Sequence, residues 1–251
     1  MKTSLTKLTA AAIILLLASC QKDAGGNLPA STDKVKTYTE DITSSSVGHL
    51  VATYNLTYDA NNRITLLADA NDPATKFVYS YPADNLIYSD IYSGGSLSIH
   101  HEAYMVNNHI DSGLQYNDSQ DTTTEKYIYN QDGNWTKTYE YQFSKATGSV
   151  LDKLTSYTYD GSGNQLTSEG SDGRGELYTY YSDKIYLHPL IGPALIPNSK
   201  RNLFKSYSVT AGSIPLATAN ISYTFDDKNR ISAEKWESND GSVVIKSYTY
   251  Y

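Results

Sequence analysis

The chain has 251 residues, a formal net charge of −7 and a single cysteine. An acidic balance repels phosphate backbones, and no basic cluster with interleaved aromatic residues stands out, so nucleic acid is excluded as a partner. One cysteine cannot form a disulfide within the chain, so the fold must be stable without such bonds. The length allows one large all-β domain or two ordinary domains.

Residues 1–19 have the organisation of a secretory signal. Lys2 and Lys7 form a basic region, and the apolar run that follows is too short to cross a membrane. The motif Leu-Ala-Ser-Cys at residues 17–20 resembles a bacterial lipobox, which implies cleavage before Cys20 and lipid, palmitate included, on its sulfur and amine. We therefore expect a lipoprotein that contacts the membrane through the lipid on Cys20.

Residues 20–35 are expected to form a lipidated, flexible tether, because Gly, Asp, Ser and Pro dominate them. Removing residues 1–19 takes away two lysines and no acid, which leaves 18 basic and 27 acidic residues and a net charge of −9. The tripeptide at 21–23, Gln-Lys-Asp, is similar to the export signal that sends lipoproteins of the Bacteroidota to the outer face of the outer membrane. The resemblance implies an outer-membrane location, at the cell surface rather than the periplasmic face.

Residues 36–251 are interpreted as one domain built from a repeated unit, which starts with an aromatic residue and enters an Asp/Asn/Gly turn. The unit returns roughly every two dozen residues, a period typical of repeat architectures. The aromatic residues that head the units are Tyr58, Tyr81, Tyr104, Tyr129, Tyr159, Tyr181 and Phe225.

Each unit predicts a β-hairpin followed by a return connection. Asp and Asn bond back to the backbone of a turn, and Gly adopts positive φ without steric cost. Before the turns, aromatic rings often come at i and i+2, as at Tyr79 and Tyr81, which places both on one face of a strand. The sequence thus predicts an all-β antiparallel meander of about 14 to 16 strands, curled into an open or closed barrel-like shell. Tyrosines are expected to point largely inward, and Ser, Thr and charged residues outward.

Aromatic side chains are the leading candidates for a binding site. Trp135 and Trp236 each follow a turn, and simple alternation places Trp135 on the same strand face as Tyr139 and Tyr141. Exposed aromatic ridges on sheets commonly stack on sugar rings. The alternative is that these rings only fill the interior of the shell.

Residues 185–197 form an apolar segment with three prolines, which cannot be a central strand or a helix. Leu190, Ile191 and Leu195 are its candidate contact residues. Two interpretations remain open: a cap over the edge of the sheet, or a contact with a partner or ligand.

The sequence shows no motif for catalysis or for a cofactor, and we expect a non-enzyme with neither metal nor cofactor. His100 and Glu102 share a strand face, with His101 on the other, but a metal site needs three or four ligands. Acidic turns do not meet the EF-hand pattern. Acidic residues such as Glu140 and Glu234 could form a glycosidase pair, although nothing singles out two of them. A membrane-spanning barrel is disfavoured, because strands such as residues 136–141 lack an apolar face.

The pattern Tyr-x-Tyr-Asp, turn, Asn-Arg-Ile, seen at residues 56–64 in degenerate form, resembles the YD repeats of Rhs-type proteins. Together with the lipobox and the segment at 198–206, Asn-Ser-Lys-Arg-Asn-Leu-Phe-Lys-Ser, it resembles a family of Bacteroidota lipoproteins of unknown function with a porin-like fold. The likeness covers roughly residues 36–251 and implies a fold and a location.

The sequence therefore favours a surface-exposed lipoprotein with a non-catalytic role in binding a glycan or a protein partner. Two alternatives stay open: a structural scaffold of the envelope and a polysaccharide hydrolase. No oligomeric state is predicted.

Overall fold

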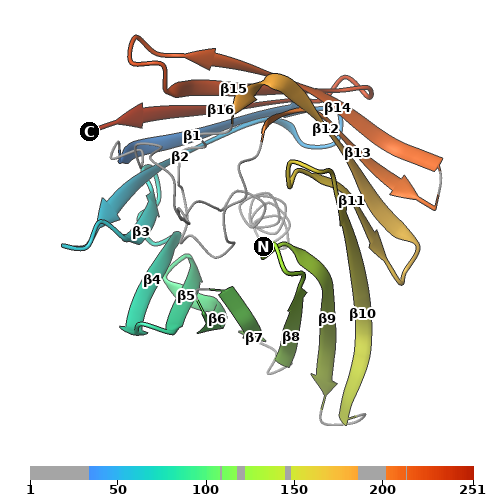
Figure 1. Cartoon of the computed structure of the whole chain (residues 1–251). Coiled ribbons are helices and arrows are strands. Elements are labelled where there is room, and N and C mark those ends of the chain that lie inside the picture. The colour runs from blue at the N-terminus through green and yellow to red at the C-terminus, as the bar shows by residue number, and fades with distance from the viewer. Residues whose placement is uncertain (1–33, 108, 118–121, 145–147, 186–201, 213) are drawn as a thin grey trace.

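The computed structural model describes residues 34–107, 109–117, 122–144, 148–185, 202–212 and 214–251, which form sixteen β-strands in one closed barrel (Figure 1). Consecutive strands pair antiparallel, and β16 pairs with β1 to close the ring. The predicted all-β meander is confirmed, with a closed sheet. In the described part of the chain, no helix is long and apolar enough to cross a membrane. The strands are β1 (Val35–Ser44), β2 (Gly48–Tyr58), β3 (Ile64–Asp69), β4 (Lys76–Ala83), β5 (Leu86–Ser93), β6 (Ser96–Val106), β7 (His109–Asn117), β8 (Thr122–Tyr129), β9 (Trp135–Ser144), β10 (Gly148–Tyr159), β11 (Gln165–Gly170), β12 (Arg174–Ile185), β13 (Asn202–Ala211), β14 (Ile214–Phe225), β15 (Ile231–Ser238) and β16 (Val243–Tyr250).

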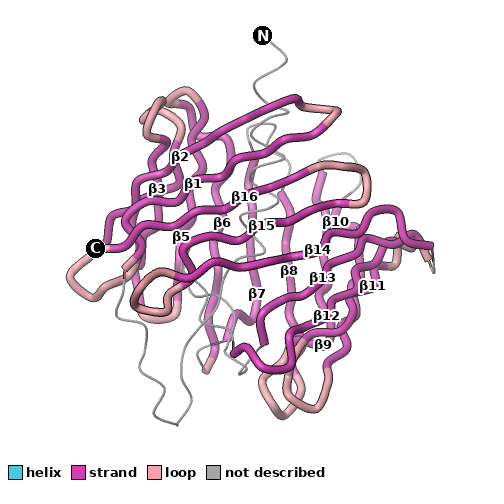
Figure 2. The backbone as a smooth tube through the Cα atoms, turned by 90° about the horizontal axis from the view of Figure 1, so that it is seen from above, coloured by secondary structure: helices cyan, strands magenta, loops and turns pink. Residues whose placement is uncertain are grey.

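Where the structure describes the connections, short loops join consecutive strands (Figure 2), and several of these loops share one hydrogen-bond pattern. In the turn between β2 and β3, the Asp59 amide donates to the Arg63 carbonyl at 2.9 Å, and Asp59 Oδ1 accepts the amides of Asn61 and Arg63. Asn62 has a φ of 63°, a left-handed conformation that Asn tolerates better than most residues. The same side-chain cap recurs at Asn130, Asp160 and Asp226.

Tyrosines tie neighbouring hairpins together near these turns. The Tyr81 hydroxyl donates at 2.9 Å to the carbonyl of Ile64, which begins β3. This bond satisfies a buried polar tip of the ring and links one hairpin to the next. Equivalent bonds join Tyr58 to Val35, Tyr129 to Ile110 and Tyr250 to Ile231.

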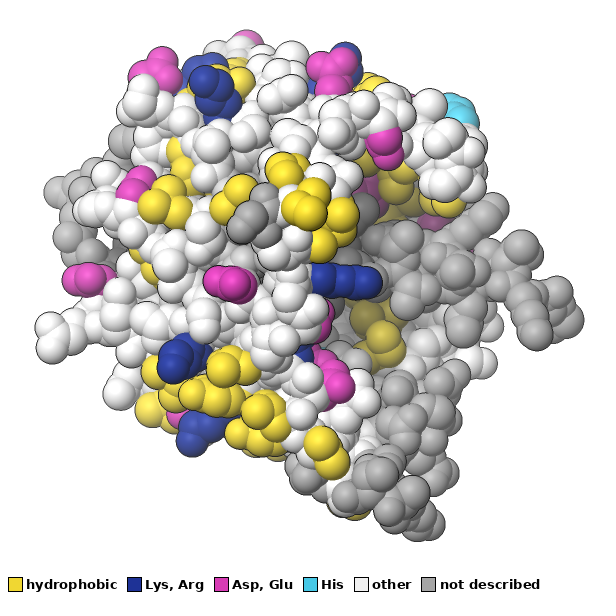
Figure 3. Space-filling model, turned by 90° about the vertical axis from the view of Figure 1, so that its right-hand side faces the viewer, with side chains coloured by type: hydrophobic (Ala, Val, Ile, Leu, Met, Phe, Trp, Pro, Cys, Tyr) yellow, Lys and Arg dark blue, Asp and Glu magenta, His cyan; other side chains and the backbone are white. Residues whose placement is uncertain are grey.

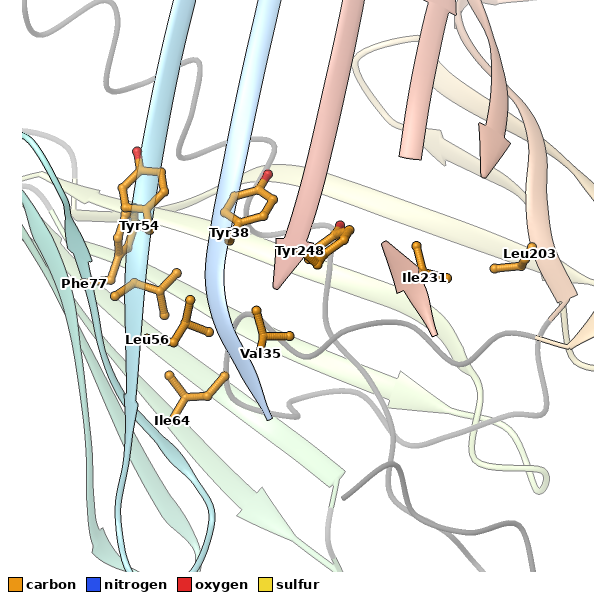
Figure 4. Packing of buried hydrophobic residues seen from close by; sticks show 10 residues of the cluster. Val35, Tyr38, Tyr54, Leu56, Ile64, Phe77, Leu203, Ile231 and Tyr248 are labelled. Atoms are coloured by element: carbon orange, nitrogen blue, oxygen red, sulfur yellow. The ribbon is translucent and has the colours of Figure 1, made fainter. Parts of the chain in front are cut away.

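The interior of the barrel is lined by rings, as expected from the i and i+2 spacing. Tyr38 on β1 lies between Tyr54 on β2 and Tyr248 on β16, at ring-centroid distances of 6.1 and 5.6 Å (Figure 4). These three rings are almost fully buried, and they pack across the β1–β16 pair that closes the barrel. Leu56 and Leu67 extend the same core along β2 and β3.

The expectation that charged residues face outward is wrong for several of them. Glu40, Lys246 and Glu234 are directly opposite one another on β1, β16 and β15. Glu40 follows Tyr38 by two residues and Lys246 precedes Tyr248 by two, so strand alternation turns both inward. Glu234 is the cross-strand neighbour of Lys246 and therefore faces the same side. Glu40 and Glu234 are 2% exposed, and Lys246 is 5% exposed.

Candidate functional site

Trp135 lies inside the barrel, away from the other residues predicted to share its strand face. Its ring centroid is 5.2 Å from that of Tyr127 and 6.0 Å from that of Tyr157. A β-bulge at the start of β9 sets two residues opposite Tyr129, which shifts the alternation by one. Tyr139 and Tyr141 therefore lie on the opposite, outer side of the sheet, and the predicted common face is wrong.

Trp236 also lies inside, within the cluster of interior charges. Its Nε1 donates to Glu234 Oε2 at 3.3 Å, and Lys246 Nζ lies 5.0 Å from its ring centroid. The Tyr248 hydroxyl donates to the other oxygen of Glu234 at 2.9 Å. Trp236 thus packs and hydrogen-bonds within the wall rather than forming a ridge with Trp135.

Glu40 is an interior carboxylate with one oxygen that is not hydrogen-bonded within the part of the chain that the structure describes. Its Oε1 is buried and accepts no hydrogen bond in the described structure. Burial raises the pKa of the Glu40 carboxyl, and the nearby Lys246 ammonium and the Tyr38 hydroxyl only partly oppose this shift. A buried carboxyl without full hydrogen bonding disfavours its own charged form.

Other interior carboxylates are held by protein hydroxyls. Glu176 accepts hydrogen bonds from Ser168, Tyr178 and Tyr207, at 2.6 to 2.9 Å. Although burial opposes it, the nearby His101 ring and a hydrogen bond from the Tyr127 hydroxyl hold the pKa of the Glu125 carboxyl below its usual range. These contacts occupy the carboxylate oxygens and give each of them a structural role.

The outer side of β5 to β9 carries the second group of aromatic residues, which we call the aromatic face. Ala103 and Gly113 are buried and face the interior, so the residues that alternate with them along the strands face outward. Strand register aligns them in rows, so that Tyr88, Glu102, Leu114, Thr124 and Tyr141 are successive cross-strand neighbours. The aromatic face consists of Tyr88, Tyr92, Tyr104, Tyr116, Tyr139, Tyr141 and Phe143.

His100 lies at the centre of the polar groups on the aromatic face. Its Nδ1 is 2.5 Å from Asp90 Oδ1, and its Nε2 is 3.4 Å from Glu102 Oε1. The Tyr104 hydroxyl donates to Glu102. The predicted common face of His100 and Glu102 is confirmed, and His101 points to the interior, 3.8 Å from Glu125.

The outer side of β1–β3 and β10–β16, which we call the hydroxyl face, is different in chemistry. Serine and threonine hydroxyls pair across neighbouring strands there, as in Thr39 with Thr53 at 3.0 Å. Figure 3, which views the side of β10 to β13, shows mainly uncharged polar side chains and backbone, with hydrophobic side chains in separate groups. The other pairs are Thr37–Thr249, Thr57–Thr65, Thr158–Thr167, Thr179–Ser206, Ser208–Thr218 and Ser232–Thr224.

Within the described ranges, no group of three or more His, Cys, Asp or Glu residues is arranged to hold a metal ion. The acidic turn at Asp69 uses its carboxylate for the turn itself, since Oδ1 accepts the amides of Asn71 and Asp72. Cys20, Leu190, Ile191 and Leu195 lie outside the described residues, so their roles stay predictions.

Sequence reasoning missed Tyr88, Tyr104 and Tyr116 as members of an outward group. Tyr104 was treated only as the head of a repeat unit. The signal in the sequence was the alternation of tyrosines with apolar residues. Ile87 on β5 and Ala103 on β6 face one side, so the tyrosines that follow them, Tyr88 and Tyr104, face the other.

The fold belongs to the class of closed sixteen-stranded antiparallel barrels. No protein-family model and no curated protein matches the chain. Among solved structures, it is similar to a porin-like protein from Bacteroides uniformis ATCC 8492, with 11% identity and a TM-score of 0.58, over 86% of this chain and 96% of the other. A porin-like protein from Bacteroides vulgatus ATCC 8482 is similar at 11% identity and a TM-score of 0.59, over 87% and 99% of the two chains. At this identity the likeness shows the fold alone.

Proposed function

We propose that this chain is a lipoprotein of the outer membrane, held by lipid on Cys20, whose barrel stands in water at the cell surface and has a non-catalytic binding role. The porin-like barrels from Bacteroides support an outer-membrane-type protein. The lipobox and the export-like tripeptide after Cys20 support lipid anchoring and surface exposure.

The hydroxyl face is the observation that best supports a barrel whose outer wall faces water rather than lipid. Strands that face lipid present an apolar band flanked by aromatic girdles, because unpaired polar groups are costly in hydrocarbon. Here the outer wall of β1 to β3 and β10 to β16 presents rows of Ser and Thr, with exposed apolar side chains such as Val51, Leu177 and Leu216 between them rather than in an unbroken band. The hydroxyl rows are readily hydrated, and a lipid anchor supplies the attachment to the membrane.

The aromatic face supports the binding role. Tyr104, Tyr116 and Phe143 are each more than a third exposed, and polar side chains such as Glu102 and Ser112 lie beside them on the same wall. Exposed rings rimmed by polar groups mark surfaces that contact a ligand or partner. A glycan or a protein partner fits this chemistry.

The barrel interior favours the scaffold as the second candidate function. Its rings pack on one another and several of its carboxylates accept bonds from tyrosine hydroxyls, as at Glu176 and Glu234. The hydrolase has no comparable support. Of the candidate acids, Glu234 is 2% exposed and therefore is not presented to a polysaccharide.

Protease treatment of intact cells, followed by immunoblotting, tests the location. We expect the band to be lost from intact wild-type cells, because the barrel is outside and its loops are accessible. Protection of the band until the outer membrane is opened would place the barrel in the periplasm and favour the scaffold. An internal periplasmic protein, blotted in the same samples, controls for leakage.

A further inference from the structure

Three rings cross the aromatic face in a continuous line from strand to strand. Tyr88 on β5, His100 on β6 and Tyr116 on β7 have ring-centroid separations of 5.2 and 5.8 Å. Neighbouring strands are about 4.8 Å apart, so the line advances by one ring per strand. We call this line the ring ladder.

Carboxylates accompany the ring ladder on the same face. Asp90 and Glu102 flank His100, and their side chains are 25% and 16% exposed. A carboxylate has two oxygens and about four acceptor positions, so the contacts with His100 and Tyr104 leave acceptors free for a ligand. The face therefore offers stacking surfaces and hydrogen-bond acceptors side by side.

We propose that the ring ladder binds a neutral glycan chain laid across β5 to β7. This inference rests on the proposed binding role and names its ligand class. Sugar units present C–H faces that stack on aromatic rings and hydroxyls that donate to carboxylates, and both features repeat along a polysaccharide as the rings repeat across the strands.

The negative charge of this surface favours a neutral glycan over an anionic one. Asp90 and Glu102 lie within the ring ladder, and the mature chain carries a net charge of −9, from 18 basic and 27 acidic residues. Sulfated or uronate-rich chains are repelled by such a surface. A lipid surface is also disfavoured, because binding there would take the remaining acceptor positions of these carboxylates out of water.

The test uses the purified full-length mature lipoprotein in mild detergent, with soluble neutral polysaccharides and anionic polysaccharides of matched length as probes. We expect calorimetry to detect binding of at least one neutral polysaccharide and none of the anionic ones. Tyr116→Ala should weaken this binding about tenfold, the loss expected for one stacked ring. Tyr116→Phe keeps the ring and should bind within about twofold of wild type.

Thr218→Ala on the hydroxyl face is the matched control and should bind as wild type does. Circular dichroism of each variant separates a lost contact from a lost fold. Equal binding by wild type and a doubly substituted Tyr88→Ala, Tyr116→Ala protein would overturn the ring ladder as the site. If no glycan binds, but the protein captures a purified surface protein and Tyr116→Ala abolishes that capture, the ligand is a protein. This result would overturn the proposed glycan ligand and leave the proposed binding role intact.

Discussion

Glu40 and Glu234 are chemically identical and equally buried, yet their environments differ. Glu234 accepts hydrogen bonds from Tyr248 and Trp236, whereas one oxygen of Glu40 has no partner in the described structure. Replacing Glu234 weakens an acceptor that buried donors use, which is costly. Replacing Glu40 neutralises a poorly solvated charge, which is favourable. The two residues should therefore respond in opposite directions to the same substitution.

Glu40→Gln is expected to stabilise the barrel at pH 7 by about 1 kcal/mol, or a rise in Tm of about 2 to 4 °C, because the desolvation of the Glu40 carboxylate outweighs its attraction to Lys246. The folded pKa of Glu40 is raised above its unfolded value, so the folded state binds the proton more readily. The stability it contributes is therefore full at low pH and is lost as the pH rises through the raised pKa. Thermal unfolding from pH 4 to pH 8 should show a flatter profile for the variant.

Glu234→Gln is the matched comparison. It should lower the free energy of unfolding by about 1 to 3 kcal/mol, because the Tyr248 hydroxyl and the Trp236 N–H lose a charged acceptor. Destabilisation of the same size in both variants would show that the pairing described for Glu40 is wrong.

Asp59 stabilises its turn in a pH-dependent way. Hydrogen bonds from the backbone of Arg63, with further bonds from the Arg63 side chain and Asn61, lower the pKa of Asp59 despite some desolvation. Its stabilising effect is present above the unfolded pKa and is lost as the pH falls through the lowered value. Asp59→Asn should fold normally at pH 7, since Asn130 caps an equivalent turn, and should lose this dependence on acid.

Asp59→Ala removes the side-chain acceptor altogether and should lower Tm at every pH. Thermal melts of the three proteins at pH 3 to 7 distinguish these outcomes. An Asn variant as unstable at pH 7 as the Ala variant would mean that the charge, and not the cap, holds the turn.

At the scale of the hairpin, the hydrogen bond from a tyrosine hydroxyl to a carbonyl of the preceding hairpin repeats around the barrel. Tyr81→Phe keeps the ring and its contact with Arg63, whose guanidinium carbon lies 4.1 Å from the ring centroid, but loses the bond to the Ile64 carbonyl. We expect a loss of about 1 kcal/mol and a Tm lower by about 2 to 4 °C. Tyr139→Phe on the outer side is the control and should leave Tm within about 1 °C.

The centre of β7 holds a glycine for a steric reason. A Cβ at Gly113 would lie 3.0 Å from His101 Nε2 and 3.1 Å from Glu125 Oε2. Gly113→Ala should therefore cost about 1 to 3 kcal/mol in urea unfolding, since the His101–Glu125 pair must move. The neighbouring outward Ser112→Ala should be nearly neutral, and equal stability of the two variants would contradict the packing described here.

The sequence predicted the hairpins because their chemistry is local. Asp, Asn and Gly at the turns determine the hydrogen bonds within five residues, as at Asp59 and Asp226. Which face a side chain occupies was less predictable, because a single extra residue reverses the alternation. The bulge at Trp135 separated it from Tyr139 and Tyr141. The same bulge follows the turns after Tyr58, Tyr159 and Phe225.

At the scale of the whole molecule, closure could not be predicted, because it depends on pairs distant in sequence. β1 meets β16 through Tyr38 and Tyr248, which are separated by most of the chain, and a meander with the same hairpins could equally stay open. The difference between the aromatic and hydroxyl faces depends on strand register, which bulges such as the one at Trp135 reset.

The central claim is that the barrel stands in water and that lipid on Cys20 holds it to the membrane. Replacing residues 1–20 by a cleavable signal peptide without a cysteine, followed by cell fractionation, tests this directly. The account predicts that the full barrel leaves the outer-membrane fraction and is recovered folded without detergent, because its outer wall carries paired hydroxyls. Retention in the outer membrane, or recovery only with detergent, would show that the strands face lipid and would contradict it.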